Sequence, residues 1–195
     1  MRQANNPNLF VISGGPGAGK TTVLHELARL GFRYAPEVAR QIIQEQLRSG
    51  GNALPWSDCQ TYTDLMLQRS IESFKKHTPA SEPLFADRGI PDTLGYARLI
   101  GLDHTGYIEN ACRRYRYTAL VFLAPPWKEI YRRDSERKQD FIEADRTYQY
   151  MIEAYRECGY ETIELPKLTA AARAKFILDR LQLRVRMSHN NKMLR

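Results

Sequence analysis

The sequence has 195 residues, of which 43% are hydrophobic and 26% are charged, a composition typical of one soluble globular domain. No apolar run approaches the roughly 20 residues that span a bilayer, and the first residues lack the hydrophobic segment of a signal peptide. The three cysteines are far apart and form no C-x-x-C pair, which disfavours a disulfide framework or a zinc site. We therefore expect reduced thiols and a cytoplasmic location.

The net charge of +7 raises the question of whether nucleic acid is a partner. More than half of this charge lies in residues 184–195, which contain four lysine or arginine residues and no acidic residue. A short basic terminus of this kind more often frays than binds, so we expect a single domain at residues 1–183 followed by a flexible tail. Because the rest of the chain carries little net charge, the sequence disfavours nucleic acid binding.

Short apolar runs alternate with longer helical patterns along the chain. The apolar runs predict five strands, at residues 9–13, 32–37, 83–89, 118–126 and 160–166. The helical patterns predict helices from the glycine-rich turn to residue 30 and at 38–49, 57–77, 91–101, 106–117, 127–138, 145–158 and 169–183. This alternation predicts an α/β fold of three layers, in which helices cover both faces of a parallel sheet.

Residues at the helix ends support several of these boundaries. Gly31 occupies the position of a C-cap glycine, and Thr169 is placed to cap the last helix. Ser57 is followed three residues later by a glutamine, which is a capping-box pattern. In the helix predicted at 38–49, we assign Leu47 to the apolar face.

Residues 10–22, FVISGGPGAGKTT, contain the pattern G-x-x-x-x-G-K-[ST] between a predicted strand and a predicted helix, as in a P-loop. Glycines let successive backbone N–H groups turn toward a phosphate, and the helix start adds its own N–H groups and positive dipole end. Lys20 can reach the β- and γ-phosphate oxygens, and the Thr21 hydroxyl can ligate Mg²⁺. The candidate nucleotide-binding residues are Gly15, Gly17, Ala18, Gly19, Lys20, Thr21 and Thr22.

Asp87 ends the apolar run LFAD and is the candidate acid on the metal side of the site. A site for Mg²⁺ and a nucleotide requires a carboxylate at the end of a neighbouring strand to hold the metal and its water shell. Asp87 could instead cap the helix that begins near Pro91, but Asp92 lies nearer that position. We therefore assign Asp87 to the metal or the substrate.

Glu37 falls at the carboxyl end of the second predicted strand, the sheet edge at which ligands bind in open α/β folds. An acid there can accept a proton from an acceptor hydroxyl or position a water molecule. The sequence equally allows an acid that simply favours the N-terminus of the next helix. Arg40, one helical turn later, is either an ion-pair partner of Glu37 or a ligand for a substrate anion.

The segment YRRDSERKQDF, at residues 131–141, is rich in arginine and follows the fourth predicted strand. Arg133 and Arg137 are four residues apart and would share one face of a helix. Mobile arginines often close over the charge that develops during phosphoryl transfer, although a mixed-charge helix on the surface would have the same composition. The position after the fourth strand favours a lid, with Arg133 and Arg137 as catalytic candidates and Arg132 as a nucleotide contact.

The sequence resembles the small bacterial AAA-domain predicted ATPases related to ribosylnicotinamide kinase, and the wider group of nucleoside and nucleotide kinases. The resemblance covers about residues 9–183 and depends on GGPGAGKTT, APEVAR, LFADRGIPDTLGY and the arginine-rich stretch after ALVFLAPP. The first of these motifs is specific, and the others are short. The chain shows no sensor arginine or helical lid domain of the ring-forming AAA+ proteins.

The resemblance implies a P-loop NTPase fold whose five parallel strands lie in the order 2-3-1-4-5, with ATP as the nucleotide. It implies that Asp87 and Arg88 form an acid–arginine pair that meets metal and substrate, and that Glu37 acts as a base. It also implies that the segment after Leu165 borders the adenine. The lid arginines of the family match Arg132, Arg133 and Arg137.

These residues favour a kinase that transfers the γ-phosphate of ATP to a nucleoside-like or other small hydroxyl acceptor. An alternative is an ATPase or a nucleotide-dependent switch that acts through a protein or lipid partner. A third hypothesis, an enzyme that phosphorylates nucleic acid ends, would require a basic channel that the sequence does not indicate.

Overall fold

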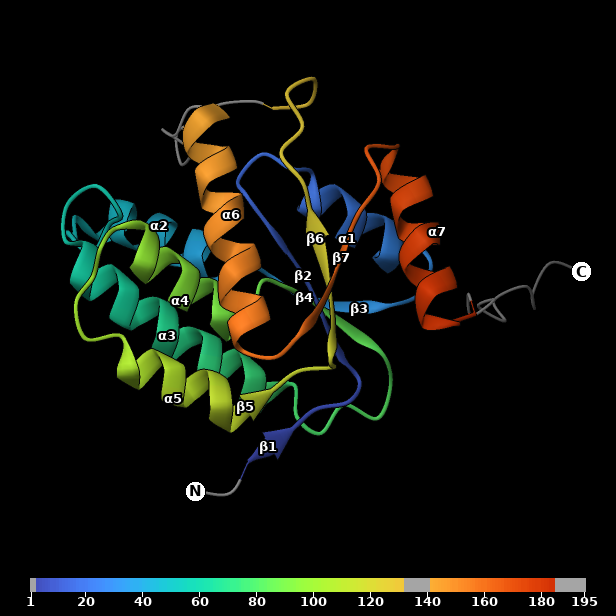
Figure 1. The fold of residues 1–195 in the computed structure, drawn as a ribbon, viewed down its shortest axis with the longest axis horizontal. Helices are drawn as coiled ribbons and strands as arrows, with labels where there is room; N and C mark the ends of the chain where they lie inside the picture. Colours follow the sequence, from blue (N-terminus) through green and yellow to red (C-terminus); the bar gives the residue numbers. More distant parts are fainter. Residues whose placement is uncertain (1–2, 132–140, 185–195) are drawn as a thin grey trace, which may run out of the picture.

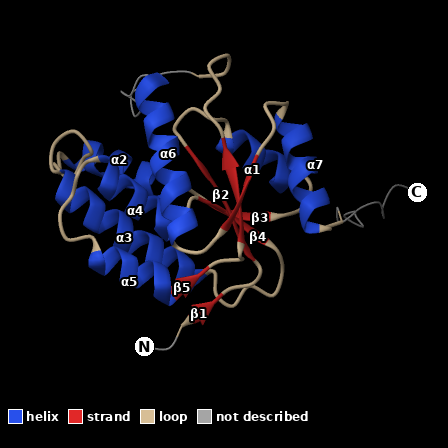
Figure 2. Ribbon diagram, viewed as in Figure 1, coloured by secondary structure: helices blue, strands red, loops and turns tan. Residues whose placement is uncertain are grey.

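The structure is a computed structural model that describes residues 3–131 and 141–184. Its centre is a five-stranded parallel sheet between two layers of helices (Figure 1, Figure 2). The α/β fold in three layers is therefore confirmed. The strands of this sheet are β2 (Leu9–Gly14), β3 (Arg33–Ala35), β4 (Leu84–Asp87), β6 (Leu120–Ala124) and β7 (Glu161–Glu164).

The strands lie in the order β3-β4-β2-β6-β7, which is the predicted order 2-3-1-4-5 when these five strands are counted along the chain. β2 is the central strand, and its register pairs Ile12 with Asp87 on β4 and Gly14 with Ala124 on β6. Because all five strands run in parallel, their carboxyl ends meet at one edge of the sheet. The glycine-rich loop and Asp87 therefore lie beside each other at that edge.

Helices cover both faces of the sheet. α1 (Lys20–Arg29) and α7 (Ala170–Leu181) pack on one face, to the right in Figure 1. The opposite side is built from α3 (Cys59–Lys76), α4 (Ile90–Leu99), α5 (Gly106–Arg114) and α6 (Phe141–Glu157). α2 (Val38–Ser49) packs against α3 and forms a smaller apolar cluster with it.

The side chains of β2 show why its sequence is continuously apolar. Leu9 and Val11 point into the core beneath α3 to α6, whereas Phe10 and Ile12 point into the core shared with α1 and α7. Both faces of the strand are buried, so alternation between apolar and polar residues is lost. The sheet therefore lies between two hydrophobic cores and contributes side chains to both.

A second, two-stranded sheet pairs β1 (Ala4–Asn5) with β5 (Tyr115–Arg116) in parallel. The sequence did not predict these strands, because two residues are too few to show a hydrophobic period. The helix predicted at 106–117 was wrong at its end, since α5 stops at Arg114 and residues 115–116 form β5. Within the described residues, no helix combines the length and the apolar character that crossing a membrane requires.

Two residues of the helix predictions were given the wrong role. The N-cap of α3 is Asp58, whose side chain accepts a hydrogen bond from the backbone N–H of Thr61, and not Ser57. In α2, Leu47 is 51% exposed, whereas the buried face contains Ala39, Ile42 and Ile43. Nine residues correspond to about two and a half helical turns, so Leu47 cannot share a face with Val38. By contrast, Thr169 caps α7 as expected.

The helix predicted at 127–138 does not begin at Trp127. Residues 128–130 form a turn, in which the Tyr131 N–H donates to the carbonyl oxygen of Trp127 at 3.1 Å. Residues 132–140 lie outside the described part of the chain, as do residues 185–195 of the predicted basic tail. The structure therefore carries no information on the predicted lid arginines, Arg132, Arg133 and Arg137.

Candidate active site

The glycine-rich loop connects β2 to α1, as its sequence context predicted. Gly14 has φ 131° and Gly17 has φ 71°, backbone conformations that residues with a side chain rarely adopt. A Cβ atom on Gly14 would also collide with the carbonyl oxygen of Ala124 on β6, and one on Gly17 would meet the ring of Tyr131. Two glycines of the motif are thus required by backbone conformation and by space.

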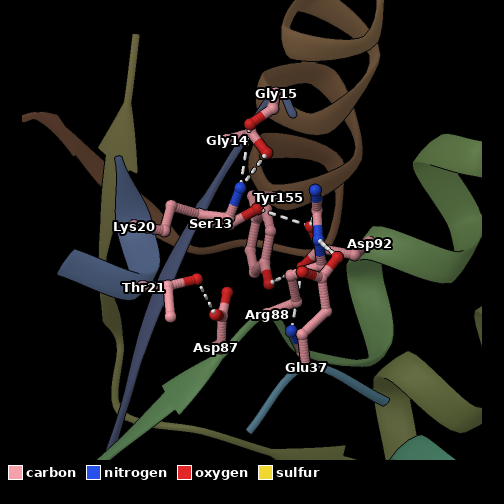
Figure 3. Close-up of polar contacts among 11 residues, drawn as sticks. Ser13, Gly14, Gly15, Lys20, Thr21, Glu37, Asp87, Arg88, Asp92 and Tyr155 are labelled. Atoms are coloured by element: carbon pink, nitrogen blue, oxygen red, sulfur yellow. Dashed lines mark hydrogen bonds and ion pairs between the residues drawn. The ribbon is translucent and has the colours of Figure 1, made fainter. Parts of the chain in front are cut away.

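Lys20 begins α1, and its side chain folds back over the loop (Figure 3). Its Nζ donates to the carbonyl oxygens of Gly14 at 3.1 Å and Gly15 at 2.8 Å. Burial, together with the positive charge of Arg88, lowers the pKa of Lys20 to about 8. The ammonium group is therefore desolvated and held where a phosphate in the loop would meet it.

Thr21 and Asp87 lie side by side, as the prediction of a metal site requires. The Thr21 hydroxyl donates to Asp87 Oδ2 at 3.3 Å (Figure 3). Asp87 is only 5% exposed, and burial and the charge of Glu37 raise its pKa to about 6. Its second oxygen, Oδ1, is buried without a hydrogen-bond partner in the described structure. A buried, unsatisfied carboxylate oxygen next to a hydroxyl fits a magnesium ion with its water ligands.

Arg88 follows β4 and connects two acids. Its Nε donates to Glu37 Oε1 at 2.6 Å, and its Nη1 donates to Asp92 Oδ1 at 2.9 Å (Figure 3). Burial lowers its pKa, but the charges of Glu37, Asp92 and Asp87 raise it further, so the net shift is upward. The guanidinium is therefore a permanent cation between two carboxylates.

Asp92 is the residue of the site that sequence reasoning assigned only to a helix cap. The capping role is confirmed, because its carboxylate accepts the backbone N–H of Gly89 at 2.8 Å. It also accepts hydrogen bonds from Ser13 Oγ at 2.5 Å and from the Tyr155 hydroxyl at 2.6 Å, in addition to Arg88. Asp92 is 2% exposed and so joins β2, α4 and α6 at one buried point.

A cavity of about 470 Å³ opens beside the glycine-rich loop. Its polar lining includes Lys20, Glu37 and Arg88, and much of the remaining lining is aromatic or aliphatic. Small-molecule sites have volumes of this size and combine apolar walls with a few polar groups. The lining residues are Pro16, Lys20, Glu37, Ala39, Arg40, Ile43, Pro55, Trp56, Tyr62, Met66, Arg88, Asp92, Tyr96, Leu99, Ile100, Glu143, Arg146, Thr147 and Met151.

The apolar walls of the cavity were not found from the sequence. Tyr62 of α3 and Tyr96 of α4 meet edge to face, with ring centroids 5.4 Å apart. Met66 and Met151 complete this side from α3 and α6. Each of these residues has the spacing of an ordinary core position on its helix, so no local signal separates them from the core.

The predicted acid and arginine that follow the second predicted strand both line the cavity. Glu37 is the N-cap residue of α2, but its side chain makes no capping hydrogen bond and pairs with Arg88 instead. Arg40 lines the cavity one turn further along α2. Thr22, at the exposed side of the loop, donates to the carbonyl oxygen of Gly19 at 2.8 Å.

This arrangement of strand, glycine-rich loop, buried lysine and neighbouring acid defines a protein with the P-loop NTPase fold. Residues 9–173 match the model of a family described as AAA domain. Since the match covers most of the sequence, the chain belongs to the AAA-domain family, as its resemblance indicated. No curated protein matches the sequence.

Solved structures with a similar fold include several kinases. Shikimate kinase from Acinetobacter baumannii in complex with shikimate has a TM-score of 0.56 at 20% identity, and the match covers 91% of this chain and 93% of that one. The NadR protein in complex with NR has a TM-score of 0.70 at 16% identity, with 93% and 53% covered. Deoxyadenosine kinase from M. mycoides with bound dATP has a TM-score of 0.61 at 15% identity, with 89% and 99% covered. The chain therefore shares the fold of the P-loop kinases.

Proposed function

We propose that this protein is a kinase-like enzyme that transfers the γ-phosphoryl group of ATP to a hydroxyl group of a small acceptor. The observation that carries the proposal is the cavity of about 470 Å³, which contains both the P-loop lysine and the pair of Glu37 and Arg88. A protein that only hydrolysed its nucleotide would need no acceptor cavity of this size beside the phosphate loop. We place the reaction in the cytoplasm, where ATP is supplied.

The nucleotide half of the site would be the loop and the start of α1. The backbone N–H groups of Gly15 and of residues 17–22 surround the phosphates, and Lys20 neutralises charge on the β- and γ-phosphate oxygens. Thr21 and Asp87 would hold Mg²⁺, which supplies charge neutralisation between these phosphates. The unsatisfied Oδ1 atom of Asp87 supports this role.

The acceptor half of the site would be the cavity. Glu37 accepts the proton of the acceptor hydroxyl as its oxygen bonds to the γ-phosphorus atom, while the bond from that phosphorus to the leaving oxygen of ADP breaks. Arg88 fixes the orientation of the Glu37 carboxylate through the 2.6 Å ion pair. Arg40, on the cavity wall, binds anionic groups of the acceptor.

The walls of the cavity favour a flat acceptor with an apolar face, because Tyr62 and Tyr96 offer ring edges and faces for packing. A nucleoside-like compound meets this requirement, and kinases for shikimate and deoxyadenosine share the fold. Arg133 and Arg137 are predicted to close over the transferred group, with Arg132 at the nucleotide. The adenine would border the segment after Leu165.

The proposal is tested by incubating the purified protein with Mg-ATP and a panel of nucleosides, other ribosides, nucleoside monophosphates and hydroxy acids. We expect one class to gain 80 Da by mass spectrometry, the mass of one phosphoryl group. Lys20→Ala should abolish both this product and the thermal stabilisation by Mg-ATP, because it removes the loop cation. Glu37→Gln should keep the stabilisation by Mg-ATP and lose the product.

If ATP is hydrolysed slowly and no acceptor of any class gains phosphate, the kinase proposal is wrong and the ATPase or switch acting through a partner takes its place. Undiminished stabilisation of Lys20→Ala by Mg-ATP would contradict the assignment of the loop itself.

A further inference from the structure

Arg173 is a buried arginine on the other side of the P-loop from the acceptor cavity. It lies on the first turn of α7, within the layer formed by α1 and α7, and is 2% exposed. Its Nη1 donates to the carbonyl oxygen of Ala18 in the P-loop at 2.8 Å. Its guanidinium lies 6.0 Å from the ring of Trp127, and a Cβ atom on Gly19 would come within 3.1 Å of Nη1.

This guanidinium has no acidic partner among the described residues. Its Nε is buried and makes no hydrogen bond there. Burial lowers the pKa of Arg173, and no acid in the part of the chain that the structure describes counters that effect. Arg88 is the useful contrast, because it is also buried and is held by Glu37 and Asp92. The two arginines therefore differ in whether the protein supplies the counter-charge.

A buried cation without a counter-charge destabilises a fold, and a single hydrogen bond to a carbonyl oxygen does not compensate for the loss of water. An apolar side chain of similar size would serve the packing of α7 against the loop at lower cost. The charge of Arg173 is explained if a bound anion neutralises it. The P-loop beside Arg173 has the form of a phosphate-binding loop, so a phosphate is the expected anion.

We propose that Arg173 is a nucleotide-binding residue, whose guanidinium is neutralised by the α-phosphate of the nucleotide at the outer edge of the P-loop. The inference rests on the nucleotide-binding part of the proposed function and not on phosphoryl transfer. Lys20 acts from the acceptor cavity on the γ-phosphate, whereas Arg173 acts from α7 on the part of the nucleotide that ATP and ADP share. Arg173 is held beside the P-loop by its hydrogen bond to the carbonyl oxygen of Ala18.

The alternative is that Arg173 only supports the P-loop through Ala18. The two roles have opposite effects on the protein without ligand. If Arg173 is only a support, replacing it by an apolar residue lowers the Tm of the ligand-free protein. If Arg173 instead binds the anion of a ligand, its charge is uncompensated in the ligand-free protein. The same replacement then removes that buried charge and leaves the Tm of the ligand-free protein unchanged or higher.

The test compares wild type, Arg173→Met and Arg173→Lys, with Arg180→Met as a control at an exposed position of the same helix. The Tm is measured without ligand, and the affinities for ATP and ADP with Mg²⁺ are measured by equilibrium dialysis. For Arg173→Met we expect an unchanged or higher Tm and an affinity about 10- to 100-fold lower for both nucleotides, because a charge-assisted hydrogen bond is lost. The nucleotide affinities of Arg173→Lys should fall between those of wild type and Arg173→Met. The Tm and the affinities of Arg180→Met should match those of wild type.

The proposal requires both results for Arg173→Met, and any other combination overturns it. A lower Tm without ligand assigns a supporting role, and an unchanged affinity removes the contact with nucleotide. If wild type binds neither nucleotide, this proposal and the proposed function fail together. If wild type binds both nucleotides but phosphorylates no acceptor, only the proposed function fails.

Discussion

Arg88 adopts a backbone conformation that is unusual for its residue type, with φ 73° in the left-handed region. Such a conformation costs of the order of 1–3 kcal/mol and persists where the surroundings impose it. Here the Arg88 N–H donates to the carbonyl oxygen of Ile12 at 3.0 Å, and the side chain is held by Glu37 and Asp92. The strained backbone lies at the end of β4, where it directs the Arg88 guanidinium toward Glu37.

The raised pKa of Asp87 makes a prediction about stability in buffer without metal. In the folded protein its pKa is about 6, above the ordinary value of 3.8, so between these values the folded state keeps a proton that the unfolded state releases. Ionisation of Asp87 therefore destabilises the fold as the pH rises from about 4 to 7. Asp87→Asn lacks this penalty, so its stability relative to wild type should increase over that range by of the order of 2 kcal/mol.

Urea unfolding of both proteins at several pH values in EDTA measures this difference. The difference in free energy of unfolding between Asp87→Asn and wild type could instead stay constant from pH 4 to 7. That result would show that the surroundings do not destabilise the ionised Asp87 carboxylate.

At the scale of elements, Asp92 ties α4 to the central strand and to α6. Ser13 and Tyr155 are 79 and 63 residues away from Asp92 in sequence, and both donate to its carboxylate. The Asp92 carboxylate also holds the first turn of α4 through Gly89. The wall of the acceptor cavity and the strand that leads into the P-loop are therefore fixed to each other through one side chain.

Asp92→Asn should destabilise the protein by about 2–4 kcal/mol, because it removes the counter-charge of Arg88 and replaces an acceptor oxygen by a donor group. Asp103→Asn, at an exposed loop position, is the control and should change stability by less than about 0.5 kcal/mol. Denaturant unfolding of both variants checks the prediction. Equal, small effects of the two substitutions would mean that the buried network does not hold these elements together.

The elements were predictable from the sequence where burial leaves a local pattern. β2 and β6 are apolar because both of their faces are covered. α2 ends before its C-cap Gly50, and α7 begins after its N-cap Thr169. The prediction of a helix at 127–138 was wrong at its start, where residues 128–130 only form a turn. The β1–β5 pair was missed because it depends on a contact between distant segments.

The residues of the candidate site divide in the same way, into those with a local sequence pattern and those that depend on long-range contacts. The P-loop has a motif whose spacing the chemistry sets, and Asp87 and Glu37 were proposed because each falls at the end of a predicted strand; the structure places all three at the carboxyl edge of the sheet. Asp92 and Arg173 matter through partners that the fold brings from elsewhere in the chain, and each looks locally like an ordinary helical residue. Long-range contact of this kind leaves no local signal.

At the scale of the molecule, the sheet separates the two halves of the candidate site. The acceptor cavity belongs to the side built from α2, α3, α4 and α6, and Arg173 belongs to the side of α1 and α7 (Figure 1). The P-loop lies between them at the carboxyl edge of the sheet. A ligand that spans both halves must therefore pass over this edge, where Lys20 and Thr21 are placed.

Among the described residues, Leu183 is the last one that contributes to the apolar cores, and it packs beside α1 and α7. We therefore propose that residues up to 183 form a complete folding unit and that the basic tail adds no stability to it. Truncation after Arg184 should change the Tm by less than about 2 °C and leave the affinity for Mg-ATP unchanged. Thermal unfolding and nucleotide titration of the shortened protein check this, and a large loss of Tm would place the tail within the fold.

The sequence contains two tryptophans, and the fold puts one in each half of the site. Trp56 lines the acceptor cavity, and Trp127 lies beside Arg173 at the outer edge of the P-loop. A protein with only one of them, Trp56→Phe or Trp127→Phe, carries a single fluorophore at a known position. The intrinsic fluorescence of these two variants would follow donor and acceptor separately, without a label, and so would reveal the order in which the two ligands arrive.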